Sequence, residues 1–374
     1  MPALPSRADV VVIGLGAAGS AALGFLARAG VKAVGIDRFA PPHERGSSHG
    51  ETRMLRMAYS EGAAYVPMVK RAIVLWRELE RRTGASLFRQ TGVLYGGPRP
   101  SEFLDAAKES ARQADVELVE RGDTRLAIPD GWQCLLDVAG GYLDAEASIS
   151  TFLQDAQAHG ATIIPNCECQ SIDAAQGEAI VSTDAGTITA KRAVVSAGAW
   201  ARELLPQLAA VTHVERRVLH WFKDTHNRYR VDEGFRPFLI ATEDDAGFYG
   251  FPANANGEVK VAEHFVVEKI NSPAELDRAA SAKDIALIEP LVRRFMPELG
   301  GYVRSSVCMY PMSRDEHFIL DRAAYPEVVF AAGLSGHGFK FAPVIGEALA
   351  SLALDRPQEI DVGFFSAKRF EAFR

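Results

Sequence analysis

The sequence predicts a mixed α/β fold: a Rossmann-like domain that is discontinuous along the chain, and a second domain built on a mixed or antiparallel β-sheet with helices. An apolar run near the N-terminus ends at a glycine-rich turn, which is typical of a βαβ unit. Short β-like runs return after residue 160 and again after residue 327, whereas aromatic β-like runs occupy the stretch between them. We therefore expect residues 1–90, 146–208 and 314–374 in the first domain, and residues 91–145 and 209–313 in the second.

The first 37 residues predict a binding site for a dinucleotide. An apolar run over residues 8–13 leads into Gly14-Leu15-Gly16-Ala17-Ala18-Gly19, and a second apolar run ends at Asp37. Gly14 allows a tight turn, Gly16 allows the backbone to approach a pyrophosphate, and Gly19 allows the helix to pack closely. The helix N-terminus favours phosphate charge, and an acid at the position of Asp37 accepts hydrogen bonds from a ribose.

Helical and β-like patterns alternate along the rest of the chain. A polar loop over residues 40–61 is too long to be a simple linker. The expected helices cover residues 63–82, 102–115, a stretch that begins at 147, residues 274–296 and a last stretch that ends near 354. The expected strands cover residues 87–97, 135–144 with a break at two glycines, 162–164, 179–181, 193–196, 218–222, 247–252, 258–265 and 328–332.

Composition excludes several classes of protein. The net charge of −7, from 41 Lys and Arg against 48 Asp and Glu, argues against a nucleic-acid partner. The apolar runs are shorter than the ~20 residues that cross a bilayer, and the N-terminus runs directly into the first strand without a signal peptide. The four cysteines form neither a disulfide framework nor a zinc site. We therefore expect a cytoplasmic protein of two domains, with neither a membrane partner nor a metal.

The polar loop carries two arginines, Arg53 and Arg56, with His49 and Tyr59 nearby. If the end of the loop is helical, the two arginines share one face and form a cationic pocket in an acidic protein. A guanidinium can hold a carboxylate through two parallel hydrogen bonds and so fix its orientation. Surface salt bridges are the alternative interpretation of the same residues.

A second glycine-rich turn follows the apolar run at 328–332. Gly333, Gly336 and Gly338 lie before a predicted helix, so this turn forms a second strand-turn-helix site. The helix N-terminus stabilises partial negative charge, and Lys340 can add a full positive charge. A lysine that extends along the surface into solvent fits the same position.

The run at residues 258–265 puts Lys260 and His264 on one face of a strand. Four strand residues separate them by roughly 13 Å, so they cannot serve one atom. A lysine on an inner face indicates a paired or functional group, although a solvent-facing lysine fits this pattern equally well. His264 alone is more often structural than catalytic.

Together these motifs resemble the family of monomeric sarcosine oxidases and N-methyltryptophan oxidases, amine-oxidising flavoproteins of the D-amino-acid-oxidase-like superfamily. The match is collinear over essentially the whole chain. It rests on Gly14-x-Gly16-x-x-Gly19, Pro41-Pro42-His43, His49-Gly50-Glu51-Thr52-Arg53-x-x-Arg56-x-Ala58-Tyr59-x-Glu61-Gly62, Tyr249-Gly250-Phe251-Pro252, Cys308-Met309-Tyr310 and Gly336-His337-Gly338-Phe339-Lys340-Phe341.

The resemblance implies an FAD cofactor that is tethered to the protein through the sulfur of Cys308. Cys308 matches the cysteine that carries the 8α-methyl carbon of the flavin ring in that family. The cofactor-binding residues implied by the match are Gly14, Gly16, Gly19, Asp37, Arg38, Ser47, His49, Thr52, Cys308, Gly336, Gly338 and Lys340.

The resemblance also implies the residues that handle the substrate. Arg56 and Lys340 match two cations that hold the substrate carboxylate, and Tyr249 and His264 match residues that line the substrate cavity. Three catalytic residues are implied: His49 and Arg53 beside the flavin ring, and Lys260 near flavin N5. A fixed positive charge at Lys260 would stabilise the superoxide formed when O2 takes the first electron.

The expected activity is oxidation of the C–N bond of a secondary α-amino acid, sarcosine or another N-methyl amino acid, with O2 as the acceptor. Hydrolysis of the resulting imine gives formaldehyde and the demethylated amino acid. The alternatives are a dehydrogenase of a pipecolate- or proline-like amino acid that passes electrons to a carrier, and a flavin-binding scaffold without turnover. Met57, Pro311 and Glu263 depart from the family pattern, so the amine is not fixed by the sequence. The family favours a monomer whose partners are the small-molecule substrate and O2.

Overall fold

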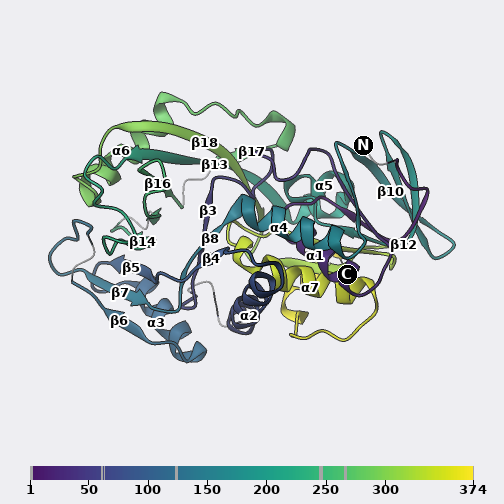
Figure 1. Cartoon of the computed structure of the whole chain (residues 1–374), viewed down its shortest axis with the longest axis horizontal. Helices are drawn as coiled ribbons and strands as arrows, with labels where there is room; N and C mark the ends of the chain where they lie inside the picture. Colours follow the sequence, from purple (N-terminus) through teal and green to yellow (C-terminus); the bar gives the residue numbers. More distant parts are fainter. Residues whose placement is uncertain are drawn as a thin grey trace.

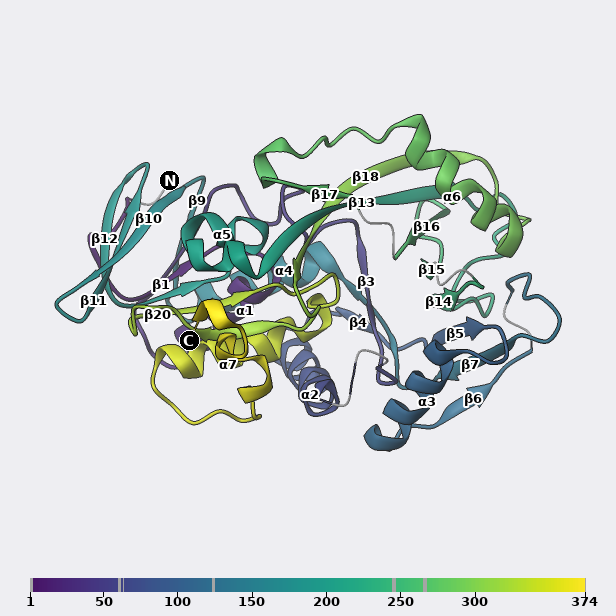
Figure 2. The same cartoon turned by 180° about the vertical axis from the view of Figure 1, so that it is seen from behind.

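Two large β-sheets organise the protein in the computed structural model, which describes residues 3–59, 62, 64–122, 125–243, 247–264 and 268–373. Figures 1 and 2 show them at opposite ends of the long axis of the molecule. The helices α1 (Ala17–Arg28), α2 (Tyr65–Thr83) and α7 (Ala342–Ala353) lie near the middle of these views, next to the first sheet. The chain crosses between the ends several times, so residues far apart in sequence meet at the junction.

The first sheet has eight strands within the described residues, and three separated stretches of chain supply them. β1 pairs in parallel with β2 on one side and with β12 on the other, and β20 adds in parallel to β12. Its strands are β1 (Arg7–Ile13), β2 (Ala33–Asp37), β9 (Thr162–Pro165), β10 (Cys169–Ala175), β11 (Glu178–Thr183), β12 (Gly186–Val195), β19 (Ile319–Arg322) and β20 (Val328–Ala332).

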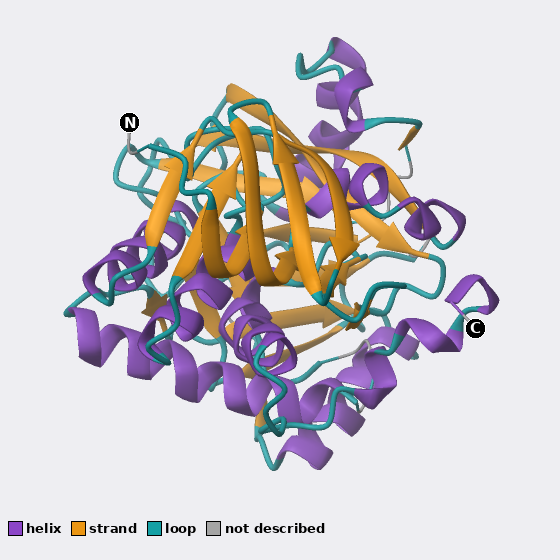
Figure 3. Cartoon of the chain, turned by 90° about the vertical axis from the view of Figure 1, so that its right-hand side faces the viewer, coloured by secondary structure: helices purple, strands orange, loops and turns teal. Residues whose placement is uncertain are grey.

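Both faces of this sheet are covered, and the alternation along β1 shows why. Val10 and Val12 belong to the core that includes α1 (Ala17–Arg28), α4 (Ala145–Ala158) and α7 (Ala342–Ala353), whereas Val11 and Ile13 belong to the core on the opposite face. Successive strand residues point to opposite faces, so a strand buried on both sides must be apolar throughout. Figure 3 shows the strands side by side with helices packed beneath them.

The second sheet has nine strands within the described residues, and a long antiparallel pair, β13 and β18, forms its spine. Its strands are β5 (Val93–Gly97), β6 (Leu118–Glu120), β7 (Gln133–Asp137), β13 (Thr212–Lys223), β14 (Phe238–Ala241), β15 (Gly247–Gly250), β16 (Glu258–Glu263), β17 (Lys269–Ile270) and β18 (Tyr302–Ser313). In the register of the long pair, Cys308 lies opposite Arg217.

A small sheet links the two large ones. It contains β3 (Thr52–Leu55), β8 (Gly141–Asp144) and β4 (Phe88–Arg89), in the order β3-β8-β4. The remaining helices are α2 (Tyr65–Thr83), α3 (Glu102–Ala114), α5 (Ala201–Leu204) and α6 (Ala282–Phe295), with 3₁₀ turns at Gly198–Trp200, Pro206–Ala210, Pro273–Glu275, Phe339–Phe341, Gly363–Phe365, Ala367–Arg369 and Glu371–Phe373.

The predicted fold class is confirmed, and the clearest error among the predicted helices concerns residues 274–296. The helix expected over residues 274–296 begins only at Ala282, where Ser281 and Asp284 form a reciprocal capping box. Arg216 explains the irregular segment before it, because this guanidinium donates to the carbonyl oxygens of Asp277 (3.2 Å) and Ala279 (3.0 Å). The predicted domain boundaries stay a prediction.

Two further expectations are limited by what the structure describes. Residue 265, the expected end of the strand at 258–265, lies outside the described residues, and β16 ends at Glu263. Among the described helices, none combines the length and the apolar character that crossing a bilayer requires.

Candidate functional site

The turn between β1 and α1 has the geometry of an anion-binding loop. Gly14 adopts a φ of +87°, and a Cβ there would lie 2.8 Å from the Cα of Ala197, so only glycine fits. Gly16 caps α1 without any side-chain hydrogen bond, and the first turn of this helix carries no acidic residue. Its N–H groups and positive dipole end are therefore suited to a phosphate.

Asp37 fastens this turn to the end of β2. Its carboxylate is buried and accepts a hydrogen bond from the Leu15 N–H (2.7 Å) through one oxygen and from the Phe39 N–H (2.8 Å) through the other. The same residue lines the cavity above the turn, where the sequence predicts a ribose. Arg38 lines that cavity too, 3.4 Å from Glu168.

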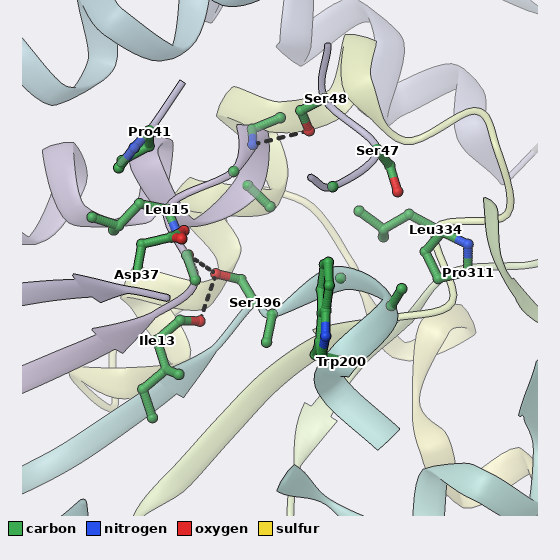
Figure 4. A pocket seen from close by; sticks show the side chains of 18 of the residues that line it. Ile13, Leu15, Asp37, Pro41, Ser47, Ser48, Ser196, Trp200, Pro311 and Leu334 are labelled. Carbon is green, nitrogen blue, oxygen red and sulfur yellow. Dashed lines mark hydrogen bonds between the residues drawn. The ribbon is translucent and has the colours of Figure 1, made fainter. Parts of the chain in front are cut away.

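A long cavity of about 190 Å³ runs along the carboxyl ends of β1, β2 and β12. Figure 4 shows Asp37 and Pro41 at one side and Pro311 and Leu334 at the other, with Trp200 between them. The Ser196 hydroxyl donates to the Gly14 carbonyl (2.7 Å) and so holds the glycine turn open. Ser47 Oγ is buried in this cavity and has no hydrogen-bond partner within the protein, so it is able to bond to a ligand there.

A second cavity of about 80 Å³ continues the first. Four residues line both cavities: Arg53, Tyr310, Gly336 and Phe339. The structure brings together here most of the residues that the sequence predicts for catalysis and substrate binding, from β3, β15, β16, β18 and the second glycine turn: Arg53, Arg56, Tyr249, Lys260, His264, Cys308 and Lys340.

Lys260 is the most deeply buried cation of the second cavity, with 2% of its surface exposed. Its Nζ donates to the carbonyl oxygens of Thr52 (2.6 Å) and Gly50 (2.7 Å) and lies 4.2 Å from the centre of the Phe251 ring. Burial, reinforced by the charge of Arg53, holds the pKa of the Lys260 ammonium well below its usual range. Of the two orientations that the sequence left open for this lysine, the inward one is found.

Arg53 and Arg56 reach the site from an extended segment; the loop end is not helical, so the shared helix face considered for them does not form. Residues 52–55 form β3, whose pairing with β8 fixes an extended backbone. Arg53 donates to the carbonyl oxygens of Thr52 and Ser47, each at 2.8 Å, and lines the first two cavities. Arg56 lies just beyond the strand, 95% buried and 4.9 Å from the Tyr59 ring, and also lines the second cavity.

Aromatic side chains and one thiol, that of Cys308, form part of the wall of the second cavity. Tyr249 lies 6.1 Å from His264, ring centre to ring centre, and His264 lies 6.2 Å from Tyr310. Burial raises the pKa of Tyr249 well above its usual range and keeps its hydroxyl protonated. Cys308 is a free, buried thiol; burial raises its pKa, and the charges of Arg53 and Arg217 oppose that rise.

The second glycine turn faces this junction. Gly336 has a φ of +76°, and a Cβ there would lie 2.3 Å from the Tyr310 ring. The helix predicted directly after the turn starts later: a 3₁₀ turn covers Phe339–Phe341, and α7 begins at Ala342. Lys340 therefore lies in the 3₁₀ turn, 95% buried, and its Nζ donates to the His337 carbonyl oxygen (2.8 Å), which excludes the surface interpretation.

His49 and Thr52 lie behind the cavity wall and at its edge. His49 is 99% buried and is not among the described residues that line the first two cavities. Burial lowers the pKa of its imidazole to about 3. Its Nε2 and the Thr52 Oγ1 are buried without hydrogen-bond partners, although Thr52 does line the second cavity. Gly338, predicted beside the cofactor, lines the first cavity.

The three departures from the family pattern have different positions. Pro311 lines the first cavity, in view in Figure 4, and its carbonyl accepts the Ser335 N–H at 2.9 Å. Met57 is buried in the core, where its N–H donates to Asp137 (2.6 Å), and Glu263 ends β16; neither is among the described residues that line the cavities.

Sequence reasoning missed the residues that hold the loop carrying these groups. The Glu146 carboxylate accepts the N–H of Gly50 (2.7 Å) and that of Glu51. The side chain of Glu51 accepts from Trp221 Nε1 (3.1 Å) on β13 and pairs with Arg304 on β18. These contacts join residues that lie far apart in the chain, so no local sequence pattern predicts them.

The fold and the site together define an enzyme that uses a dinucleotide cofactor. A glycine turn and a helix N-terminus lie at a long cavity. This cavity adjoins a second one, which is lined by several cationic side chains. Comparison with known proteins makes this specific. Residues 9–352 match the model of the FAD dependent oxidoreductase family, and the chain belongs to that family.

A relative of similar length indicates the class of reaction. The chain is 38% identical to the N-methyl-L-tryptophan oxidase of Yersinia pestis (strain Pestoides F) over 371 residues, covering 97% of this chain and 99% of that protein. The predicted resemblance is thereby confirmed, and the protein is an FAD-dependent amine oxidoreductase.

Solved structures agree with the fold. NikD, an unusual amino acid oxidase essential for nikkomycin biosynthesis, superposes with a TM-score of 0.84 at 21% identity and covers 97% of this chain and 98% of its own. L-proline dehydrogenase from P. horikoshii superposes with a TM-score of 0.83, also at 21% identity, over 98% of this chain and 99% of its own. The residues present fit FAD, because the long cavity combines an anion-binding turn with the unpartnered hydroxyl of Ser47.

Proposed function

We propose that the protein is an oxidase of N-methyl α-amino acids, sarcosine or a larger homologue, that uses O2 as its electron acceptor. The overall reaction is that a secondary N-methyl amine, O2 and water give the primary amine, formaldehyde and hydrogen peroxide. The observation that carries the proposal is the meeting of three buried cations, Arg56, Lys340 and Lys260, in one cavity that continues the cofactor cavity. Such charges are costly to bury unless they serve an anion or a developing negative charge.

In this proposal Arg56 and Lys340 hold the substrate carboxylate. Both lie next to the Tyr59 ring, each with its charged group 4.9 Å from the ring centre, and both line the second cavity. Tyr249 and His264 close the cavity around the amine. The 38% identity to an N-methyl-L-tryptophan oxidase supports an N-methyl amino acid as the substrate class.

FAD, when bound, takes two electrons from the substrate C–N bond and later delivers them to O2. The glycine turn and α1 would hold its pyrophosphate, Asp37 its ribose, and Arg53, Thr52 and the second glycine turn its ring, with His49 buried behind them. Lys260, held by the Gly50 and Thr52 carbonyl oxygens, supplies a fixed charge where O2 is reduced, which lowers the cost of forming superoxide.

We also propose that Cys308 carries the flavin covalently. Its thiol lines the second cavity, while the next two residues, Met309 and Tyr310, line the first, so the sulfur lies where the two cavities join. The location in the cytoplasm and the monomeric state stay predictions.

The test is a panel of amines added without oxygen to the purified yellow protein: sarcosine, N-methylalanine, N-methyltryptophan, pipecolate and proline. Bleaching of the flavin by an N-methyl amino acid, followed by rapid recovery of the yellow colour on admission of air, supports the proposal. Bleaching without recovery in air would indicate a dehydrogenase that needs a carrier. A flavin that none of the panel bleaches would contradict the proposed substrate class.

A further inference from the structure

A third cavity, of about 260 Å³, extends the proposed substrate cavity away from the cofactor. Five residues line both cavities: Arg56, Leu239, His264, Tyr310 and His337. A substrate whose carboxylate lies at Arg56 would therefore be able to extend its side chain into this space. Sarcosine has no side chain and would leave it unused.

Arg217, on β13, is the unusual residue of the third cavity. It is 93% buried, and two of its guanidinium nitrogens, Nε and Nη1, have no hydrogen-bond partner. Its Cζ lies 5.0 Å from the centre of the Tyr310 ring, which lines all three cavities. A buried guanidinium with two unmet donors is costly, which points to an acceptor that arrives with a ligand.

The charge around Arg217 selects the kind of acceptor. Its third nitrogen, Nη2, donates to Glu215, which is 96% buried and also accepts from His213 (2.8 Å). The charge of Arg217 is thus already balanced, and a second carboxylate would be repelled by Glu215 at low dielectric. Glu316 lines the same cavity and adds to this repulsion, whereas the charge of Asp315 is balanced by Arg369 at 2.7 Å. An uncharged carbonyl oxygen can accept from Arg217 without adding charge.

Resting on the proposed function, we propose that the third cavity is a side-chain subsite in which Arg217 binds an uncharged carbonyl, so that the preferred substrates are N-methyl amino acids with a carboxamide side chain. Arg217 acts here as a specificity residue, remote from the C–N bond. The carboxamide of N-methyl-L-glutamine is the simplest example of this chemistry.

Binding of ligands that lack an amine tests the subsite apart from turnover. Titration calorimetry on the holoenzyme compares 4-carbamoylbutanoate with 5-methylhexanoate, an apolar molecule of the same shape, and with glutarate, which carries a second charge. The carbamoyl ligand should bind about tenfold or more tightly than either, the range that a hydrogen bond to a charged group contributes. Arg217→Met should abolish this difference, whereas the exposed control Arg293→Met should retain it.

The outcomes separate this inference from the proposed function. Equal binding of the carbamoyl and apolar ligands to the wild-type protein would overturn the subsite, and tighter binding of glutarate would overturn the uncharged acceptor. Anaerobic flavin reduction supplies the second readout: N-methyl-L-glutamine should exceed N-methyl-L-leucine and N-methyl-L-tryptophan in the ratio of the flavin-reduction rate constant to Kd. If sarcosine bleaches the flavin but no such preference exists, only the inference fails. If no N-methyl amino acid bleaches it, the proposed function fails.

Discussion

The Nζ atom of Lys260 lies 2.6 Å from the carbonyl oxygen of Thr52, which joins the middle of β16 to the first residue of β3. This contact holds a strand of the nine-stranded sheet against the loop that carries Arg53, beside the junction of the first two cavities. The lysine is thus fixed in place by backbone acceptors, and no carboxylate pairs with its Nζ among the described residues. Its Nζ therefore keeps a fixed position in the wall of the second cavity.

Replacing Lys260 with Met should separate the two halves of the reaction. We expect reoxidation by O2 to slow roughly a hundredfold or more, the usual effect of removing one stabilising charge or donor, while anaerobic reduction changes little. Stopped-flow absorbance measures both rates. Lys223→Met is the matched control, because Lys223 also donates to a carbonyl (Asn256, 2.6 Å) but is exposed. Equal losses in both half-reactions would remove Lys260 from the oxygen step.

Cys308→Ala should break the covalent link without unfolding the protein, since the side chain loses only one atom. Acid precipitation of the wild-type protein should leave the yellow colour in the pellet, and precipitation of the variant should release it to the supernatant. Cys134→Ala, at another buried free thiol, serves as the control and should behave like the wild type. A yellow pellet from Cys308→Ala would show that another residue carries the flavin, and release of the colour from the wild-type protein would show that no residue does.

Arg56→Met should weaken binding of the substrate carboxylate. A hydrogen-bonded charge contributes about 1.5–3 kcal/mol, so KM and the Kd of simple carboxylate inhibitors should rise about ten- to a hundredfold. Spectral titration of the flavin with such an inhibitor gives the Kd directly. Arg230→Met, at an exposed arginine paired with Asp232, should change neither quantity. Normal inhibitor binding by the Arg56 variant would place the carboxylate elsewhere.

The buried His49 should make the protein sensitive to acid. Its pKa is lowered to about 3 in the folded protein from an ordinary 6.5, so the unfolded chain binds the additional proton between these values. The free energy of unfolding should therefore fall as pH falls from 6.5 toward 3, by at most about 1.4 kcal/mol per pH unit for one group. His220, whose pKa burial lowers to about 4, acts in the same direction.

His49→Asn should flatten this dependence by removing one of the two groups. Urea unfolding of the variant at pH 4.5 to 7 measures the slope, and the exposed His226→Asn is the control that should leave it unchanged. An unaltered slope in His49→Asn would mean that His49 is protonated in the folded protein.

Sequence patterns predicted the features that depend on neighbouring residues, and they failed where contacts with distant residues determine the backbone conformation. The turn at Gly14 and the end of β2 at Asp37 follow from a short motif, because the backbone conformation there needs particular residues. The helix expected from residue 274 failed because Arg216, far away in the chain, binds the carbonyl oxygens that a helix would use. The unpaired nitrogens of Arg217 could not be predicted for the same reason, because they depend on residues far away in the chain. The adjacent pair Arg216 and Arg217 within one strand was a local indication of buried charge.

The most direct test of the central claim is the stoichiometry of products formed in air. With an N-methyl amino acid that bleaches the flavin, the purified protein should release one formaldehyde and one hydrogen peroxide for each O2 consumed. That result would establish both the cleaved bond and the electron acceptor. Formaldehyde formed only when an artificial electron carrier is added, with neither O2 uptake nor peroxide, would contradict the assignment as an oxidase.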